Sequence, residues 1–437
     1  GGRGGALGDP GTTGIYRSDD GGNTWRKLHA NNPRPMYFSQ VRVDPTNPNT
    51  VYVSGLPWAK STDGGKTFAT LDDAGGNNTS GHVDNHAMYI DPKNPKHLMI
   101  GNDGGLSVSW DQGNTWDYVN TMATGLAYWV SADMRRPYWV YTGLQDNGSK
   151  MGPSTMKNGG NIPFEAWTNV GGGDGQQNIV DNPASRFLYT ESQFGAIGRL
   201  DLATGQNKGM GGMGRGGAGG TMVDGVEVRW NWNAPIVVSP HNPDTVYHAG
   251  NVVFRSTTRG DIWERISGDL TKNDPATKNG TGNVSYATLT AFDESPVVPG
   301  VLWSGSDDGV VHVSRDGGRT WTNVTDKIPG HPGYWVSRIE PSHVAAGTAY
   351  LSLTGLRNDD FRPFLFKTTD YGQTWTSMAN GLPNQAINTV REDPYNTDLL
   401  FVGTDLGLYG SLDAGKSWTK ITGTAQAGAA GGRGGGF

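Results

Sequence analysis

One short phrase, Ser-x-Asp-x-Gly-x-Thr-Trp or a close variant of it, returns seven times along this chain of 437 residues. The six well-kept copies each end in an aromatic residue, at Trp25, Phe68, Trp116, Trp321, Trp375 and Trp418. A seventh copy, Ser256 to Trp263, is degenerate: Thr258 stands where Asp is expected. We call it the worn copy. Self-similarity of this kind predicts a repeat architecture, so the phrase restricts the fold before any other feature does.

A second signature precedes most copies of the phrase. It is an alternating apolar strand that ends in Asp-Pro-x-Asn-Pro, as at 44–48 and 91–95. Together the two signatures mark units about 40 to 60 residues apart. The units start near positions 41, 88, 130, 179, 236, 290, 337 and 390.

Each unit has the pattern of four short strands joined by tight turns, which is typical of propeller blades. An alternating α/β fold would need helices between the strands, and no segment shows a convincing 3.6-residue period. The sequence therefore predicts an all-β fold: a β-propeller of seven or eight four-stranded antiparallel blades, belonging to a larger protein with more than one propeller. We expect the propeller domain to cover 12–421, with a partial blade at 12–28.

Glycine-rich stretches interrupt or flank this domain, at 1–11, 205–221 and 422–437. Their composition is that of flexible surface segments. They contain too few arginines, on too acidic a background, to predict an RNA-binding arm.

The acidic residue of the phrase has a structural explanation. An Asp in a tight turn accepts backbone N–H bonds, the glycine supplies a positive φ, and the threonine begins the returning strand. The final Trp then buries a large face between neighbouring sheets. The acidic positions predicted to be structural are Asp20, Asp63, Asp111, Asp316, Asp370 and Asp413.

Composition excludes several classes of function. The chain has no cysteine, which rules out disulfides, thiol catalysis and thiolate metal sites. A net charge of −6 with mixed signs gives no basis for a nucleic-acid partner. No apolar run reaches the roughly 18 residues that a membrane span needs. The lack of cysteine favours a bacterial protein over an animal ectodomain, and we expect it to be extracellular, periplasmic or on the cell surface.

The phrase resembles the Asp-box of BNR-repeat propellers, and the resemblance covers about residues 12–421. That superfamily includes sialidases, xyloglucan-degrading endoglucanases and sortilin-type receptors. The chain most resembles large secreted bacterial proteins described as sortilin-like or glycosyl-hydrolase BNR proteins. The resemblance implies the fold and says little about function.

The enzyme families of that group differ in how well they fit. Sialidases need an arginine triad and a Tyr nucleophile, and the chain has no early Arg-Ile-Pro-type segment. Xyloglucan-degrading enzymes are similar in repeat pattern, and their cleft lies between two propellers that each supply one catalytic Asp. This resemblance implies that a second propeller domain or chain of the same protein would be a partner.

The four-strand order places the turns on two faces. The phrases and Asp-Pro turns share one face, while the second-to-third-strand turns and the entries to each first strand share the other. We expect a site on this second face. Its carboxylates predict a catalytic pair for glycoside hydrolysis, which needs two such groups about 5–10 Å apart, and the candidates are Asp103, Asp146, Asp174 and Asp307.

Two further groups lie on the same predicted face. His82, Asp84 and His86 alternate, so on an extended strand they would project to one side and could bind a metal or transfer a proton. The simpler explanation is a polar turn that bonds its own backbone. Candidate ligand-binding residues, suited to a sugar or a peptide, are Trp129, Trp230, Trp232, Trp335, Gln145 and Asn147.

The sequence leaves three functions open. The first is a binding scaffold that recognises a protein or a polysaccharide on this face. The main alternative is a xyloglucanase-like glycoside hydrolase with an Asp pair, in which Asp146 is one member. The third is a metal-dependent enzyme that uses His82, Asp84 and His86, and no other cofactor is predicted.

Overall fold

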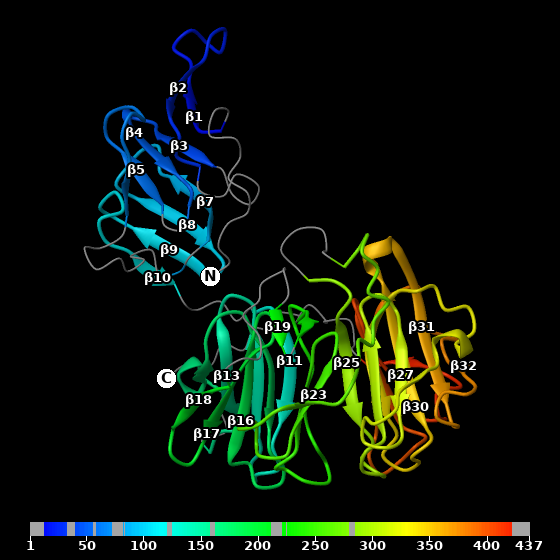
Figure 1. Cartoon of the computed structure of the whole chain (residues 1–437). Helices are drawn as coiled ribbons and strands as arrows, with labels where there is room; N and C mark the ends of the chain where they lie inside the picture. The colour runs from blue at the N-terminus through cyan, green and yellow to red at the C-terminus, as the bar shows by residue number, and fades with distance from the viewer. Residues whose placement is uncertain are drawn as a thin grey trace, which may run out of the picture. The chain divides into compact units, whose positions relative to one another are not determined.

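The computed structural model describes residues 13–32, 40–55, 58–71, 82, 84–119, 125–157, 162–210, 221–223, 225–278 and 285–421 (Figure 1). Within these residues the chain is almost entirely β-strand, with three short 3-10 turns and no α-helix. Eight four-stranded antiparallel sheets are present, each a meander in chain order, which confirms the predicted fold class. The predicted segments 1–11 and 422–437, and 211–220 of the internal glycine-rich loop, lie outside the described residues.

The chain divides into two compact units, and each is described by itself. Unit 1 comprises 1–126 together with the turn 145–147, and unit 2 comprises 127–144 and 148–437. The sheets of unit 1 are β1 (Ile15–Arg17) and β2 (Arg26–His29); β3 (Val41–Asp44), β4 (Asn47–Val53), β5 (Ala59–Ser61) and β6 (Ala69–Thr70); and β7 (Asn85–Ile90), β8 (Leu98–Asn102), β9 (Gly105–Ser109) and β10 (Asp117–Val119).

Unit 2 contains six four-stranded sheets. The first three are β11 (Ala127–Ala132), β12 (Trp139–Leu144), β13 (Gly148–Pro153) and β14 (Thr168–Gly171); β15 (Gly175–Val180), β16 (Phe187–Ser192), β17 (Ala196–Asp201) and β18 (Asn207–Gly209); and β21 (Ile236–Val238), β22 (Val246–Ala249), β23 (Val253–Ser256) and β24 (Glu264–Arg265). The last three are β25 (Leu289–Glu294), β26 (Leu302–Ser306), β27 (Val311–Ser314) and β28 (Thr322–Asn323); β29 (Trp335–Pro341), β30 (Ala349–Gly355), β31 (Asp360–Thr368) and β32 (Thr376–Ser377); and β33 (Ile387–Glu392), β34 (Leu400–Thr404), β35 (Gly407–Ser411) and β36 (Thr419–Lys420).

Short elements complete unit 2. They are the hairpin β19 (Thr221–Val223) and β20 (Val226–Val228) and the 3-10 turns η1 (Phe164–Ala166), η3 (Thr325–Lys327) and η4 (Leu356–Asn358). Among the described residues, no helix has the length and apolarity to cross a membrane.

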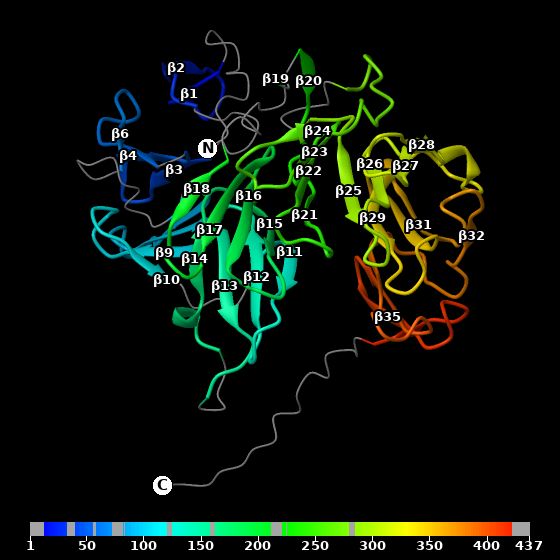
Figure 2. The same cartoon turned by 60° about the horizontal axis from the view of Figure 1, so that its bottom comes forward.

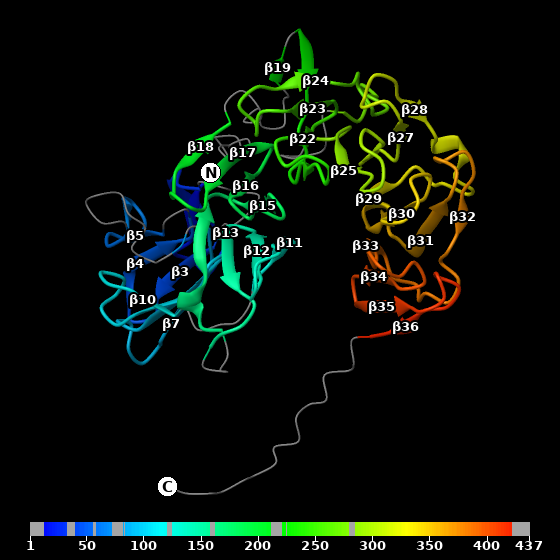
Figure 3. The same cartoon turned by 90° about the horizontal axis from the view of Figure 1, so that it is seen from below.

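The six sheets of unit 2 follow one another around an arc, as blades of a propeller do (Figures 2 and 3). Their first strands contact in sequence, β11 with β15, then β21, β25, β29 and β33. Apolar side chains fill the space between neighbouring sheets; one such cluster joins Trp303 to Val336 and Leu351. The first strand of each sheet is therefore innermost, and the fourth lies at the outer edge.

The repeated phrase forms the same hydrogen-bonded turn in each intact copy. At Ser314–Trp321, the Ser314 hydroxyl donates to Asp316 Oδ1 (3.0 Å) and accepts the Gly318 N–H (2.9 Å). The two Asp316 oxygens accept the backbone N–H and the hydroxyl of Thr320, at 2.9 and 2.7 Å. These bonds from Thr320 lower the pKa of Asp316 to about 2. The turn chemistry predicted for the phrase is confirmed.

The other copies repeat these contacts. Corresponding carboxylates accept from the residue four positions on at Asp20, Asp63, Asp111, Asp370 and Asp413. In the worn copy, the Thr258 hydroxyl accepts the Ile262 N–H at 2.9 Å and replaces the missing carboxylate. All these acidic groups are thus held within their own turns.

The aromatic residue of the phrase packs on the preceding sheet. The Trp375 ring meets Trp303 edge-on with 6.1 Å between centroids, and the Trp418 indole N–H donates to the carbonyl of Met378. The expectation that every phrase buries its Trp is wrong for Trp25, which is 64% exposed. Its hairpin β1–β2 is the first sheet in chain order among the described residues, and the Trp25 ring mainly faces solvent there.

Two sheets form without the phrase, as the gap in the repeat predicts. Sheets β11–β14 and β15–β18 rely instead on buried aspartates at their first turns. Asp133 accepts from the Trp139 N–H and the Tyr141 hydroxyl, and Asp181 accepts from the N–H groups of Arg186 and Phe187. The phrase therefore stabilises a blade but is not needed to make one.

Candidate active site

Three carboxylates of unit 1 come together. One oxygen from each of Asp84, Asp103 and Asp146 lies within 4.8 Å of the other two. Asp84 immediately precedes β7, Asp103 follows β8, and Asp146 belongs to the turn 145–147, which packs with unit 1. Two of the four predicted catalytic residues, Asp103 and Asp146, are thus neighbours, and a predicted metal ligand joins them. We call these three residues the acidic cluster.

Local turn chemistry positions the cluster. In the turn between β8 and β9, the Asn102 side chain accepts the Gly104 N–H at 3.0 Å, which fixes the backbone around Asp103. Asp84 and Asp146 both have a positive φ, at 56° and 58°. Glycine is required at position 104, because a Cβ there would stand 2.5 Å from the His82 ring.

Two histidines border the acidic cluster. His86 Nε2 lies 2.8 Å from Asp103 Oδ1, and His82 Nε2 lies 3.0 Å from the backbone oxygen of Asp146. Asn147 adds a bond from its side-chain amide to the Asp103 carbonyl at 3.2 Å. The cluster therefore has one imidazole against a carboxylate, His86 on Asp103, and a second, His82, against the backbone of Asp146.

His82, Asp84 and His86 do not lie along one extended strand as predicted. The alternation argument is wrong, because β7 begins only at Asn85 and Asp84 has a left-handed backbone rather than an extended one. Each His makes a contact of its own, and the set of close oxygen atoms is carboxylate only. Such a set offers the ligands that hard cations prefer, whereas zinc is bound mainly by nitrogen and sulfur.

The other two predicted catalytic aspartates lie in unit 2. Asp174 is 7% exposed and accepts from the Gln193 amide at 2.8 Å. Asp307 is 2% exposed and accepts both the N–H and the hydroxyl of Thr288. Burial raises the pKa of Asp307 to about 7, against these bonds. A carboxyl this enclosed supports its own sheet and presents no surface to a polymer.

The four predicted ligand-binding tryptophans are in three kinds of environment. Trp230 is 2% exposed and stacks on His248 with 4.3 Å between centroids, so the expectation of an exposed ring there is wrong. Its position before β21 brings it into a core cluster with Phe254. Trp232 is half-buried and donates its indole N–H to the Tyr128 hydroxyl at 3.1 Å.

Trp129 and Trp335 each lie against an arginine. Arg338 is 5.3 Å from the centroid of Trp129, and Arg357 is 4.3 Å from that of Trp335. Both rings are half-buried, and Trp129 lines a pocket on the inner side of unit 2.

Gln145 and Asn147 serve the turn that carries Asp146. The Gln145 N–H donates to the Leu126 carbonyl at 3.0 Å, and the Asn147 amide donates back to the Gln145 carbonyl at 2.9 Å. These bonds orient the acidic cluster.

The comparisons with known proteins agree on one enzyme type. The chain is 22% identical over 399 residues to a probable oligoxyloglucan-reducing end-specific xyloglucanase of Neosartorya fischeri. The matched region covers 83% of this chain and 43% of that protein. It is 26% identical over 215 residues to a xyloglucanase of a Paenibacillus species, covering 43% of this chain and 20% of that one. The chain thus spans less than half the length of the relatives it matches. No protein-family model matches the chain.

Two solved structures are also similar. A GH74 enzyme of Niastella koreensis is 16% identical and covers 93% of this chain and 75% of its own, and a GH74 xyloglucanase of Xanthomonas campestris is 15% identical with 93% and 76% covered. Both have a TM-score of 0.25.

Proposed function

We propose that the chain belongs to a glycoside hydrolase that acts on a polysaccharide of the xyloglucan type. The observation that carries the proposal is the similarity to a xyloglucanase across 83% of the chain. The acidic cluster supplies what that chemistry requires, because glycosidases use a pair of carboxyl groups on either side of the bond they cleave.

We assign the catalytic pair to Asp103 and Asp146. Carboxyl groups about 5–5.5 Å apart are typical of retaining enzymes, and wider pairs of about 6.5–9.5 Å are typical of inverting ones. One oxygen of Asp103 lies within 4.8 Å of one oxygen of Asp146, and from this closeness we propose the retaining arrangement. Asp103, held by His86, would be the nucleophile; Asp146, on a separate turn, would transfer the proton to and from the leaving oxygen.

The binding scaffold is a weaker candidate than the hydrolase. It would explain the fold equally well, yet it gives no reason for three carboxylates and two histidines to converge. A polysaccharide of this size is encountered and degraded outside the cell. We therefore also propose an extracellular, periplasmic or cell-surface location. A second propeller domain or chain would complete the substrate cleft.

Hydrolysis of polysaccharides by the purified protein tests the proposal. Reducing ends released from xyloglucan, other β-glucans and sialosides would be measured for the wild type, Asp103→Asn and Asp146→Asn. We expect release from xyloglucan alone, lowered by about 10³-fold or more in both variants. Asp117→Asn, an exposed carboxylate on β10, is the matched control and would keep full activity. Absence of release from every substrate, or release that both variants leave intact, would contradict the assignment.

A further inference from the structure

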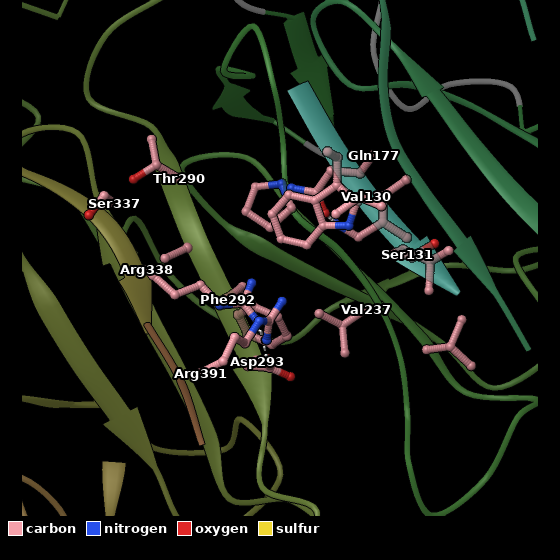
Figure 4. A pocket seen from close by; sticks show the side chains of 16 residues that line it. Val130, Ser131, Gln177, Val237, Thr290, Phe292, Asp293, Ser337, Arg338 and Arg391 are labelled. Atoms are coloured by element: carbon pink, nitrogen blue, oxygen red, sulfur yellow. Dashed lines mark hydrogen bonds and ion pairs between the residues drawn. The ribbon is translucent and has the colours of Figure 1, made fainter. Parts of the chain in front are cut away.

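A pocket of about 260 Å³ lies on the inner side of unit 2, and nothing in the hydrolase proposal uses it. The first strand of each of the six blades contributes to its wall, from β11 through β33. Figure 4 shows Arg338, Arg391 and Asp293 gathered on one side and Val130, Ser131 and Gln177 on another. All the lining residues belong to unit 2.

The charged side of the pocket is a network of ion pairs in which some arginine N–H groups make no hydrogen bond to described protein groups. Arg338 Nη2 contacts Asp293 at 3.1 Å and Glu340 at 3.0 Å, and Arg391 Nη1 also binds Glu340. Among the described residues, Arg338 Nη1 and Arg391 Nε and Nη2 donate to no protein group. The Arg391 side chain is 43% exposed, so its unused N–H groups are accessible.

Asp293 supplies the matching acceptor. Burial raises the pKa of Asp293, while the Arg338 guanidinium 3.1 Å away opposes that rise and favours the carboxylate form. Its Oδ1 accepts the Glu294 N–H and its Oδ2 accepts Arg338, which leaves lone pairs on both oxygens. Donors and an acceptor therefore stand side by side.

The remaining wall is aromatic and aliphatic. Trp129 lines the pocket with the Arg338 guanidinium over its ring, and Val130, Ile179, Val237 and Phe292 continue the apolar surface. Small polar groups are already used: Ser131 bonds the Asn178 carbonyl, and Ser337 bonds the Ile387 carbonyl. The charged hydrogen-bonding groups of the wall are Asp293, Arg338 and Arg391, and the Gln177 side chain, whose oxygen accepts the Ile236 N–H, adds a neutral amide.

This combination excludes two kinds of ligand. A small inorganic anion would gain little, because Asp293 and Glu340 balance the two guanidinium charges. A purely apolar ligand would leave the free guanidinium N–H groups without water or partner, at a cost of about 1–3 kcal/mol each. A neutral polyhydroxylated ring satisfies both sides, since its hydroxyls can donate to Asp293 and accept from arginine while its C–H face covers the apolar wall.

We propose that the inner pocket of unit 2 binds one neutral sugar ring, with Trp129 and the neighbouring apolar side chains against its face and Asp293, Arg338 and Arg391 bonded to its hydroxyls. The volume is below the roughly 300–1,000 Å³ of pockets for larger ligands, which limits the occupant to about one ring. The proposal rests on the proposed function for the class of sugar. It adds a binding subsite in unit 2, separate from the acidic cluster of unit 1.

Binding measurements on an inactive background test the subsite. Calorimetry and tryptophan fluorescence would follow D-glucose, D-xylose and a xyloglucan oligosaccharide added to Asp146→Asn protein, in which the oligosaccharide stays intact. We expect saturable binding that Trp129→Leu and Arg391→Lys each weaken about tenfold or more. Lysine keeps a positive charge facing Glu340 but cannot place donors where the Arg391 Nε and Nη2 groups stand, so this variant should stay folded.

Trp110→Leu is the matched control. Trp110 is 59% exposed in unit 1, stacks on His97 at 4.0 Å and lies outside the pocket, so its loss should leave the affinity unchanged. Absence of sugar binding, equal binding by all variants, or stronger binding of inorganic sulfate than of any sugar would overturn the subsite. Xyloglucan hydrolysis by the wild type is assayed separately. It tests the proposed hydrolase function independently of sugar binding in the inner pocket.

Discussion

The imidazole of His86 lies 2.8 Å from the carboxylate of Asp103, and the two come from β7 and from the turn after β8. The His86 side chain is 37% exposed and that of Asp103 is 16% exposed, so the pair borders solvent without being fully in it. We therefore propose that His86 is a positioning residue for the proposed nucleophile, because its imidazole contacts the Asp103 carboxylate.

Replacing His86 with Ala should lower kcat for xyloglucan by about 10²-fold with little change in KM, and should move the pH dependence of kcat/KM. His86→Gln, which retains a donor, should recover part of the loss. His97→Ala is the control, because His97 also faces an aspartate, Asp91 at 3.6 Å, but in an ordinary turn. Equal losses in the His86 and His97 variants would argue for a structural role only.

Ser314 should matter more to stability than its small size suggests. It is 1% exposed, and its hydroxyl is the acceptor for the Gly318 N–H. Ser314→Ala leaves that buried N–H without a partner, and we expect the free energy of unfolding to fall by about 1–3 kcal/mol in urea denaturation. Ser314→Thr should be tolerated, because Thr368 makes the same bonds to Asp370 and Gly372 in another copy. A Thr variant as unstable as the Ala variant would contradict this explanation.

Asp307 should make the protein less stable as the pH rises. Its pKa in the folded protein is about 7, above the ordinary value near 4, so the folded state binds the proton more tightly than the unfolded state does. The stabilising effect of the protonated Asp307 carboxyl on the folded state is complete below about pH 4. It is lost as the pH approaches and passes 7. We expect Asp307→Asn to raise the free energy of unfolding by up to about 4 kcal/mol at pH 8 and by little at pH 4.

Thermal unfolding of both proteins at pH 4, 6 and 8 measures this difference. The same variant bears on catalysis: if Asp307 only supports its sheet through Thr288, xyloglucan hydrolysis should be unchanged. A large loss of activity together with unchanged stability at pH 8 would return Asp307 to the candidate catalytic residues.

The blades could be predicted from the sequence because their information is local. The bonds from Ser314 and Thr320 to Asp316 span four residues, so spacing alone identifies the turn. The acidic cluster is different, because Asp84, Asp103 and Asp146 come from three separate segments. Strand order assigned them to one face, but the pairing of Asp103 with Asp146 rather than Asp174 needed the packing of 145–147 on unit 1.

The inner pocket carried no sequence signal. Arg338 and Arg391 stand in first strands that alternate like any other, and Asp293 lies near the end of the first strand β25. Trp230 shows the reverse error: it stands between polar residues yet is buried, and the neighbouring Asn231 side chain bonds inward, donating to the Thr288 hydroxyl and accepting the Asn233 N–H. Burial between blades depends on which sheet precedes a residue, and composition does not reveal that.

The contribution of the phrase's aromatic residue to the free energy of unfolding should depend on how far its ring is buried against a neighbouring sheet. Trp375 is 7% exposed within a core cluster that includes Trp303 and Val324, so Trp375→Ala should lower the free energy of unfolding by about 3–5 kcal/mol. Trp25→Ala, at the same position of the repeat but 64% exposed, should cost well under 1 kcal/mol. Urea denaturation followed by circular dichroism compares the two. If both substitutions destabilise equally, the ring acts through its own turn, since the Trp25 and Trp375 indoles donate to Gly22 and Gly372 alike, and packing between blades is not its main contribution.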